Sequence, residues 1–233
     1  MSLPLVLLHG ANGGSAEIEP LRAALSDYFE VSAPDWLGHG GRPLPPDIDM
    51  PSLAADFIDW MDGHGIESAW IAGYSLGGSI ALYLARHYPE RVDGVMALAA
   101  KVVFDAPTLK HWTYLASVGR LEGSERAKQL EKTHAPNDWR DVARMNQRFF
   151  EALAKSPPLD AKALGEIACP VMLANANRDQ IVPWGETLAL GKLIPRSKLV
   201  MFYGLAHPIR VVPVFSVARA LDQWVRELQK EQA

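Results

Sequence analysis

Short apolar segments alternate with helix-like segments along this chain, and this alternation constrains its fold more than any other feature. Residues 3–8, 29–33, 69–72, 94–99, 171–174 and 198–203 form short apolar runs bounded by Gly, Pro or Asp. Such runs are typical of strands buried in a parallel sheet. Segments with helical periodicity separate most of them, which predicts helices on both faces of the sheet and right-handed crossovers. We therefore expect an α/β fold with a mainly parallel sheet of about six strands.

Two amphipathic stripes support this interpretation. Apolar residues recur at helical spacing from Leu53 to Met61, directly after Ser52. This pattern predicts a helix with Ser52 as its N-cap. A second and cleaner stripe over residues 214–228 predicts another helix near the C-terminus.

One long stretch, from about residue 101 to 165, breaks the alternation. It has no strand-like run, but Pro107 opens one helical pattern, and a second pattern follows Asn137 and stops at Pro157. The stretch has no Gly-rich or Ser-rich linker and no internal repeat. We therefore expect a helical cap inserted in a single domain over residues 1–233.

Composition narrows the class of partner. The 233 residues are 48% hydrophobic and 21% charged, which suits one globular domain with a sizeable core. The formal net charge of −4 gives no electrostatic reason to expect nucleic acid or an anionic membrane. We expect a small-molecule substrate that is neutral or mainly apolar, and the sequence indicates nothing about oligomeric state.

The cysteine count and the N-terminus bear on the compartment. Cys169 is the single cysteine, so an internal disulfide and a cysteine-based metal cluster are excluded. The apolar run at 5–8 is too short for a signal or membrane segment, and no basic residues precede it. We expect a cytoplasmic protein.

The motif with most chemical content is Gly73-Tyr74-Ser75-Leu76-Gly77, which matches G-x-S-x-G. A nucleophile on a sharp strand-to-helix turn holds strained backbone angles, and glycines two positions away leave room for that turn. Alone the pattern is weak, but a strand-like run precedes it and a helical pattern over 78–88 follows. This context is the one the motif requires.

Further motifs are spread over nearly the whole chain. Leu-Leu-His-Gly stands at 7–10, Asp-Trp-Leu-Gly-His-Gly at 35–40, and Asp-Gln-Ile-Val-Pro at 179–183. With the serine motif, these segments resemble the α/β-hydrolase superfamily. Because the chain begins at the strand with the His-Gly pair, we expect six parallel strands in place of the family's usual eight.

The resemblance implies a set of catalytic roles. Ser75 would be the nucleophile, His207 the general base and Asp179 the acid that orients the histidine, in the family's order along the chain. The backbone N–H groups of Ala11 and Leu76 would form the oxyanion hole. No metal and no organic cofactor is implied.

Other residues compete for some of these roles. Asp105 is the alternative acid, because some family members carry the acid after the strand that ends here near Ala100. Of seven histidines, His207 is the one that follows a strand in the expected place. Arg140, Arg144 and Arg148 recur at helical spacing and could bind a carboxylate. This spacing is more typical of a solvated face, on which we expect the i, i+3 ion pairs Asp141–Arg144 and Arg148–Glu151.

The resemblance favours a carboxylesterase that acts through an acyl-enzyme. The same triad in other members cleaves C–C bonds, opens lactones or drives an elimination, as in menaquinone-pathway synthases. A ligand receptor with slow turnover is a further alternative. Fold alone does not decide between them.

Overall fold

The computed structural model describes residues 2–204 and 206–231, and its six strands form one parallel sheet. The strands are β1 (Pro4–Leu8), β2 (Glu30–Ser32), β3 (Ala69–Tyr74), β4 (Val92–Leu98), β5 (Val171–Ala176) and β6 (Ser197–Phe202). Their spatial order is β2-β1-β3-β4-β5-β6. The predicted α/β fold with six parallel strands is confirmed.

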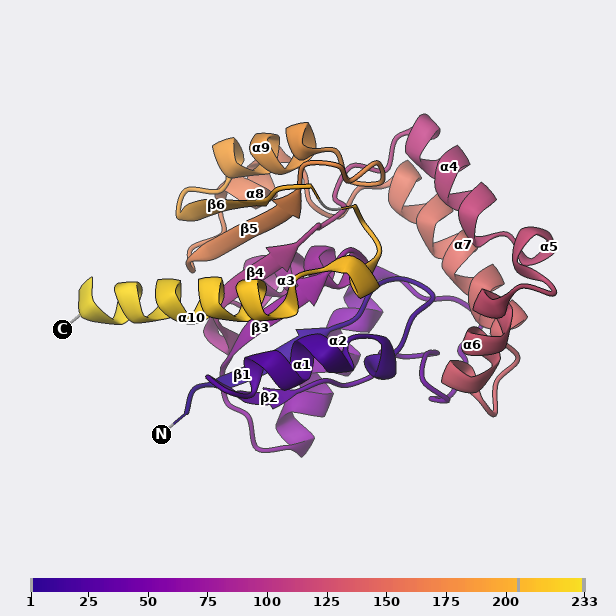
Figure 1. The fold of residues 1–233 in the computed structure, drawn as a ribbon, viewed down its shortest axis with the longest axis horizontal. Coiled ribbons are helices and arrows are strands. Elements are labelled where there is room, and N and C mark those ends of the chain that lie inside the picture. The colour runs from indigo at the N-terminus through magenta and orange to yellow at the C-terminus, as the bar shows by residue number, and fades with distance from the viewer. Residues whose placement is uncertain (1, 205, 232–233) are drawn as a thin grey trace.

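Helices cover both faces of this sheet (Figure 1). One face carries α1 (Glu19–Leu25) and α10 (Val214–Glu231), and the other carries α2 (Met50–Gly63), α3 (Leu76–His87), α8 (Ala161–Gly165) and α9 (Trp184–Leu193). The longest, α10, buries Val217, Leu221 and Trp224 and keeps charged residues on its other side. Within the described ranges, no helix is long and apolar enough to cross a membrane.

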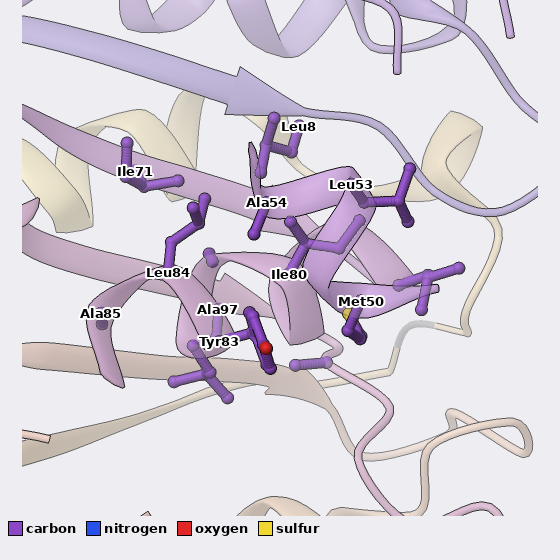
Figure 2. Close-up of a cluster of buried hydrophobic side chains, with 14 of the residues drawn as sticks. Leu8, Met50, Leu53, Ala54, Ile71, Ile80, Tyr83, Leu84, Ala85 and Ala97 are labelled. Atoms are coloured by element: carbon purple, nitrogen blue, oxygen red, sulfur yellow. The ribbon is translucent and has the colours of Figure 1, made fainter. Parts of the chain in front are cut away.

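The core beneath α2 and α3 shows why these segments fold as they do. Figure 2 shows Leu8 and Ile71 from the sheet facing Leu53 of α2 and Ile80 of α3. Each of these four side chains is at most 3% exposed. Burying a side chain of this size contributes about 1.5–3 kcal/mol.

The start of α2 corrects one prediction. Ser52 is not the N-cap, because the helix begins at Met50 and Asp49 caps it. The Asp49 carboxylate accepts from the Ser52 N–H at 2.8 Å, and the Ser52 hydroxyl in turn accepts from the Asp49 N–H at 3.0 Å. The pair forms a reciprocal capping box, with Ser52 at its third helical position.

Between β4 and β5 the chain forms a helical layer. Its helices are α4 (Ala106–Ala116), α5 (Val118–Leu121), α6 (Glu125–His134) and α7 (Trp139–Lys155), followed by α8 on the sheet. Figure 1 shows α4 to α7 grouped beyond the end of the sheet toward which the strands point. We refer to the four helices α4 to α7 as the cap.

The strand order places the site. The chain leaves β1 for β2 on one side, and its third strand then pairs with β1 on the other side. Loops after β1 and β3 therefore diverge at the carboxyl edge of the sheet. Open α/β sheets bind their ligands at such a switch point.

Candidate active site

Ser75 occupies the turn between β3 and α3. Its backbone has φ 54° and ψ −118°, a strained conformation for a residue with a Cβ. A Cβ on Gly73 would lie 2.2 Å from the carbonyl oxygen of Gly77, and one on Gly77 would lie 2.5 Å from that of His9. Both positions therefore require glycine, which explains why the motif brackets the serine with it.

His207 lies against this serine. Its Nε2 is 3.0 Å from the Ser75 Oγ, and the two residues are 8% and 1% exposed. The hydroxyl of Tyr74 donates a 2.6 Å hydrogen bond to the His207 carbonyl oxygen, and the two rings are in contact with centroids 5.2 Å apart. Tyr74 thus holds the backbone of the histidine loop beside the serine turn.

Asp179 contacts the other side of the imidazole. Its Oδ2 lies 2.6 Å from the Nδ1 of His207, and its Oδ1 accepts 2.8 Å bonds from the N–H groups of Ile181 and Val182. The carboxylate is buried in the loop after β5. A carboxylate held in this way keeps the imidazole proton on Nδ1 and leaves Nε2 free to accept a proton.

Asp105, the alternative acid, is placed elsewhere. It is exposed and forms the N-cap of α4, where its carboxylate accepts a 2.9 Å bond from the N–H of Thr108. Hydrogen bonding to Thr108, from its side chain and then from its N–H, lowers the pKa of Asp105. The structure brings Asp179 to His207 and does not bring Asp105 there.

The two predicted oxyanion donors lie at the switch point. Ala11 follows β1 and lines the same cavity as Ser75. Leu76 is the first residue of α3, where a backbone N–H has no acceptor within the helix and the helix dipole is positive. The Leu76 side chain is buried in the core, so only its backbone could face a substrate.

An open cavity of about 830 Å³ lies between the sheet edge and the cap. Ser75 and His207 form part of its floor. Apolar cap residues, among them Trp112, Leu115 and Leu130, form part of its wall. The volume accommodates a small organic molecule.

A buried polar network under the loop after β1 was not predicted. The Nδ2 of Asn146 in α7 donates to the Oδ1 of Asn12 at 2.7 Å and to the Nε2 of His39 at 2.9 Å. The Nε2 of His134 in α6 lies 3.4 Å from the Asn12 carbonyl oxygen. Because Asn12 adjoins Ala11 and has φ 53°, the cap holds this loop in a left-handed conformation.

The histidines near this network are held neutral. Burial lowers the pKa of His9 from 6.5 to about 3 and that of His39 well below its ordinary value. The His39 Nδ1 lies 3.2 Å from the Leu37 carbonyl oxygen and carries the proton, so its Nε2 accepts from Asn146. These histidines stabilise the turns in which they lie.

The three arginines of α7 do not line the cavity. Arg140 pairs with Glu122 and Asp138, and Arg144 with Asp141. The expected pair between Arg148 and Glu151 is wrong, because Arg148 reaches Asp47 at 2.7 Å. The arginine face of α7 is therefore solvated and ion-paired, as the spacing predicted.

Comparison with known proteins agrees with this architecture. A family model described as alpha/beta hydrolase fold matches residues 4–122, and the chain belongs to this family. A pimeloyl-[acyl-carrier protein] methyl ester esterase of Neisseria meningitidis serogroup B is 28% identical over 242 residues, covering 95% of this chain and 90% of that protein.

Solved structures of the same fold are also similar. A meta-cleavage product hydrolase from Pseudomonas fluorescens IP01 has a TM-score of 0.79 at 25% identity, over 97% of this chain and 91% of that one. A thermophilic esterase from Thermogutta terrifontis has a TM-score of 0.79 at 24% identity, over 97% and 90%. The latter likeness concerns the fold alone.

Proposed function

We propose that this protein is a serine hydrolase that cleaves a small carboxylic ester through an acyl-enzyme. The observation that carries the proposal is the continuous hydrogen-bonded series from Asp179 through His207 to Ser75, which ends at an open cavity. A serine hydroxyl is a poor nucleophile at neutral pH unless a base removes its proton. His207 is placed to do so.

In the first half of the reaction, the Ser75 Oγ attacks the ester carbonyl carbon while its proton passes to His207 Nε2. Asp179 stabilises the resulting imidazolium. The oxyanion receives hydrogen bonds from the N–H groups of Ala11 and Leu76. The bond to the alcohol oxygen then breaks, and His207 returns its proton to that oxygen.

In the second half, water attacks the acyl carbon and gives a proton to His207. The bond to Ser75 Oγ breaks, the serine oxygen regains the proton, and the carboxylic acid leaves. Each proton transfer uses the same imidazole nitrogen, so the cycle needs no further titrating group in this scheme.

Two comparisons bear on the substrate bond. The relative at 28% identity is described as a methyl ester esterase, which supports ester cleavage. The structure at 25% identity is described as a meta-cleavage product hydrolase, which makes C–C bond hydrolysis the second candidate. Ester cleavage and C–C bond cleavage would both be hydrolytic reactions in this site.

Labelling by a fluorophosphonate tests the central proposal. A single modified peptide that contains Ser75 is expected, because only a serine with a base beside it reacts readily. Ser79→Ala is the matched control: Ser79 is buried in the first turn of α3, close to Ser75 in sequence, but its hydroxyl donates to the Lys101 carbonyl oxygen. Loss of labelling in Ser75→Ala and its retention in Ser79→Ala would support the assignment, and labelling elsewhere with Ser75 intact would overturn it.

A panel of p-nitrophenyl esters of increasing acyl length then tests the reaction. Fast turnover with a clear optimum supports an esterase. A single slow turnover with retained product would instead support a receptor of the same fold.

A further inference from the structure

The cavity above Ser75 has an excess of positive charge. Arg120, Arg126, Lys132 and Arg210 line it, whereas Glu17 is its one lining carboxylate among the described residues. The whole chain has a formal net charge of −4, so this local excess is opposite in sign to the charge of the molecule. A cleft lined by charge of one sign concentrates ligands of the other sign.

Most of this charge has no carboxylate partner among the described residues. Glu17 pairs with Arg126 and neutralises it. Arg120, Lys132 and Arg210 are exposed, and none forms an ion pair with any residue in the ranges 2–204 and 206–231. The arginines of α7, by contrast, are all paired with carboxylates.

The three cations without a carboxylate partner come from different sides of the cavity. Arg120 lies at the end of α5 and Lys132 in α6, both in the cap. Arg210 lies in a short 3-10 helix, Ile209–Val211, just after His207. Arg120 is also held in place, because its Nη1 donates a 3.2 Å hydrogen bond to the Leu115 carbonyl oxygen and its guanidinium lies 5.1 Å from the ring centroid of Tyr114. An anion in the cavity would therefore meet cations from both the cap and the sheet edge.

Apolar residues share the lining with these cations. Trp112, Leu115, Leu130 and Ile181 contribute to the wall of the same cavity that Ser75 enters. A ligand that suits both features has an apolar segment and a charged end. Arginine suits carboxylate and phosphate groups because its planar fork of donors matches their oxygens.

We propose that the cavity selects esters whose acyl chain ends in an anionic group, a carboxylate or a phosphate, with an apolar spacer before the scissile bond. Arg120 and Arg210 bind that group while Ser75 attacks the ester at the other end. The inference rests on the proposed hydrolase function for the reaction, but not for the binding. It replaces the mainly apolar substrate expected from composition.

Paired esters test this selection. The anionic probes are mono-p-nitrophenyl esters of dicarboxylic acids from glutaric to suberic acid, and their ω-phosphonate counterparts. The neutral controls carry a terminal carboxamide of nearly the same size. We expect a higher kcat/KM for the anionic esters, by about tenfold at low ionic strength, and a loss of that preference as salt is added. The better of the two anionic series identifies which group the cavity takes.

Charge variants test the residues. Arg120→Gln/Arg210→Gln should lower the ratio of kcat/KM between anionic and neutral esters by about tenfold. The matched control, Lys110→Gln/Arg219→Gln, removes the same charge from exposed positions outside the cavity, and should keep the wild-type ratio. An unchanged ratio in the first double variant, or a wild-type preference for the carboxamides, would overturn the inference.

Binding to Ser75→Ala separates the inference from the proposed reaction. Titration calorimetry compares the anionic ester with its carboxamide, with and without Arg120→Gln/Arg210→Gln in the same background. A preference that the arginine variant removes supports the inference even if the wild type hydrolyses none of the esters, a result that would count against the hydrolase alone. Equal affinities would overturn the inference and leave the hydrolase standing.

Discussion

Asp179 divides its two carboxylate oxygens between His207 and the backbone. Oδ2 lies 2.6 Å from His207 Nδ1, while Oδ1 accepts 2.8 Å bonds from the N–H groups of Ile181 and Val182. Because both backbone groups are donors, the side-chain atom that faces them has to be an acceptor. The other carboxylate oxygen therefore faces the imidazole.

This arrangement predicts the result of Asp179→Asn. The asparagine oxygen would keep the two backbone bonds, and its NH₂ group would face Nδ1. The imidazole would then accept at Nδ1 and carry its proton on Nε2, toward Ser75, where no base would be left. We expect kcat to fall by as much as about 10⁴-fold. Steady-state kinetics on a p-nitrophenyl ester measures the loss.

Asp105→Asn is the matched control for that experiment. Asn is as good an N-cap as Asp, so α4 should be retained and kcat should change by less than about tenfold. Thermal unfolding of both variants excludes differences in stability. A large loss with Asp105→Asn and a small one with Asp179→Asn would show that the acid is misassigned.

Lys101 and Glu186 form an ion pair with unequal burial, which predicts unequal effects of mutation. The Lys101 side chain is 2% exposed and its Nζ donates to both Glu186 oxygens at 2.7 and 2.9 Å, whereas the Glu186 side chain is 23% exposed. Glu186→Gln leaves a buried ammonium without a counter-charge, so we expect a loss of about 3 kcal/mol in the free energy of unfolding. Lys101→Met leaves a carboxylate that can reach water, and its cost should be less than half as large.

Urea unfolding at neutral pH measures both changes. In the double variant, the loss should be smaller than for Glu186→Gln alone, because the uncompensated charge has gone. A larger loss for Lys101→Met than for Glu186→Gln would contradict the argument from burial.

The four central strands, β1, β3, β4 and β5, could be predicted because they are buried on both faces and therefore read as continuous apolar runs. The six predicted runs coincide with the six strands to within a few residues. Helix α6 escaped prediction for the opposite reason. Its sequence, ERAKQLEKTH, buries only Ala127, Leu130 and His134, so it has almost no apolar periodicity.

The site was predictable where it depends on local turns and not where it depends on the cap. Ser75 stands in a turn whose glycine spacing has a steric cause that can be read from sequence. Asn12 and Asn146 are 134 residues apart, and asparagine is more often exposed than buried. Only the packing of α7 over the loop after β1 brings them together. A polar residue on the apolar face of α7 is the one signal that could have indicated such a contact.

Asn146→Ala tests whether the cap holds the loop after β1. The change leaves the Asn12 side-chain oxygen and the His39 Nε2 buried without a donor. We expect a loss of about 2 kcal/mol in the free energy of unfolding. Because Asn12 adjoins Ala11, we also expect kcat to fall more than KM changes, as the loss of oxyanion alignment would cause.

Gln147→Ala provides the comparison, since Gln147 lies on the same helix and bonds only to Glu151 among the described residues. Its unfolding free energy and kcat should stay near the wild-type values. Equal behaviour of the two variants would show that the network has no influence on the loop.

The buried histidines predict a dependence of stability on pH. The folded protein holds His9 neutral down to about pH 3 and His39 neutral well below its ordinary range, because both are fully buried. The unfolded chain binds a proton at each near pH 6.5, so the unfolded state binds more protons as the pH falls below that value. The free energy of unfolding should therefore fall as the pH is lowered, by up to about 1.4 kcal/mol per pH unit for each histidine.

His39→Gln should reduce this slope by one such contribution, whatever its effect on stability at neutral pH. Urea unfolding at several pH values between about 5 and 7 measures the slopes, and the same slope in His39→Gln as in the wild type would show that burial does not keep His39 neutral.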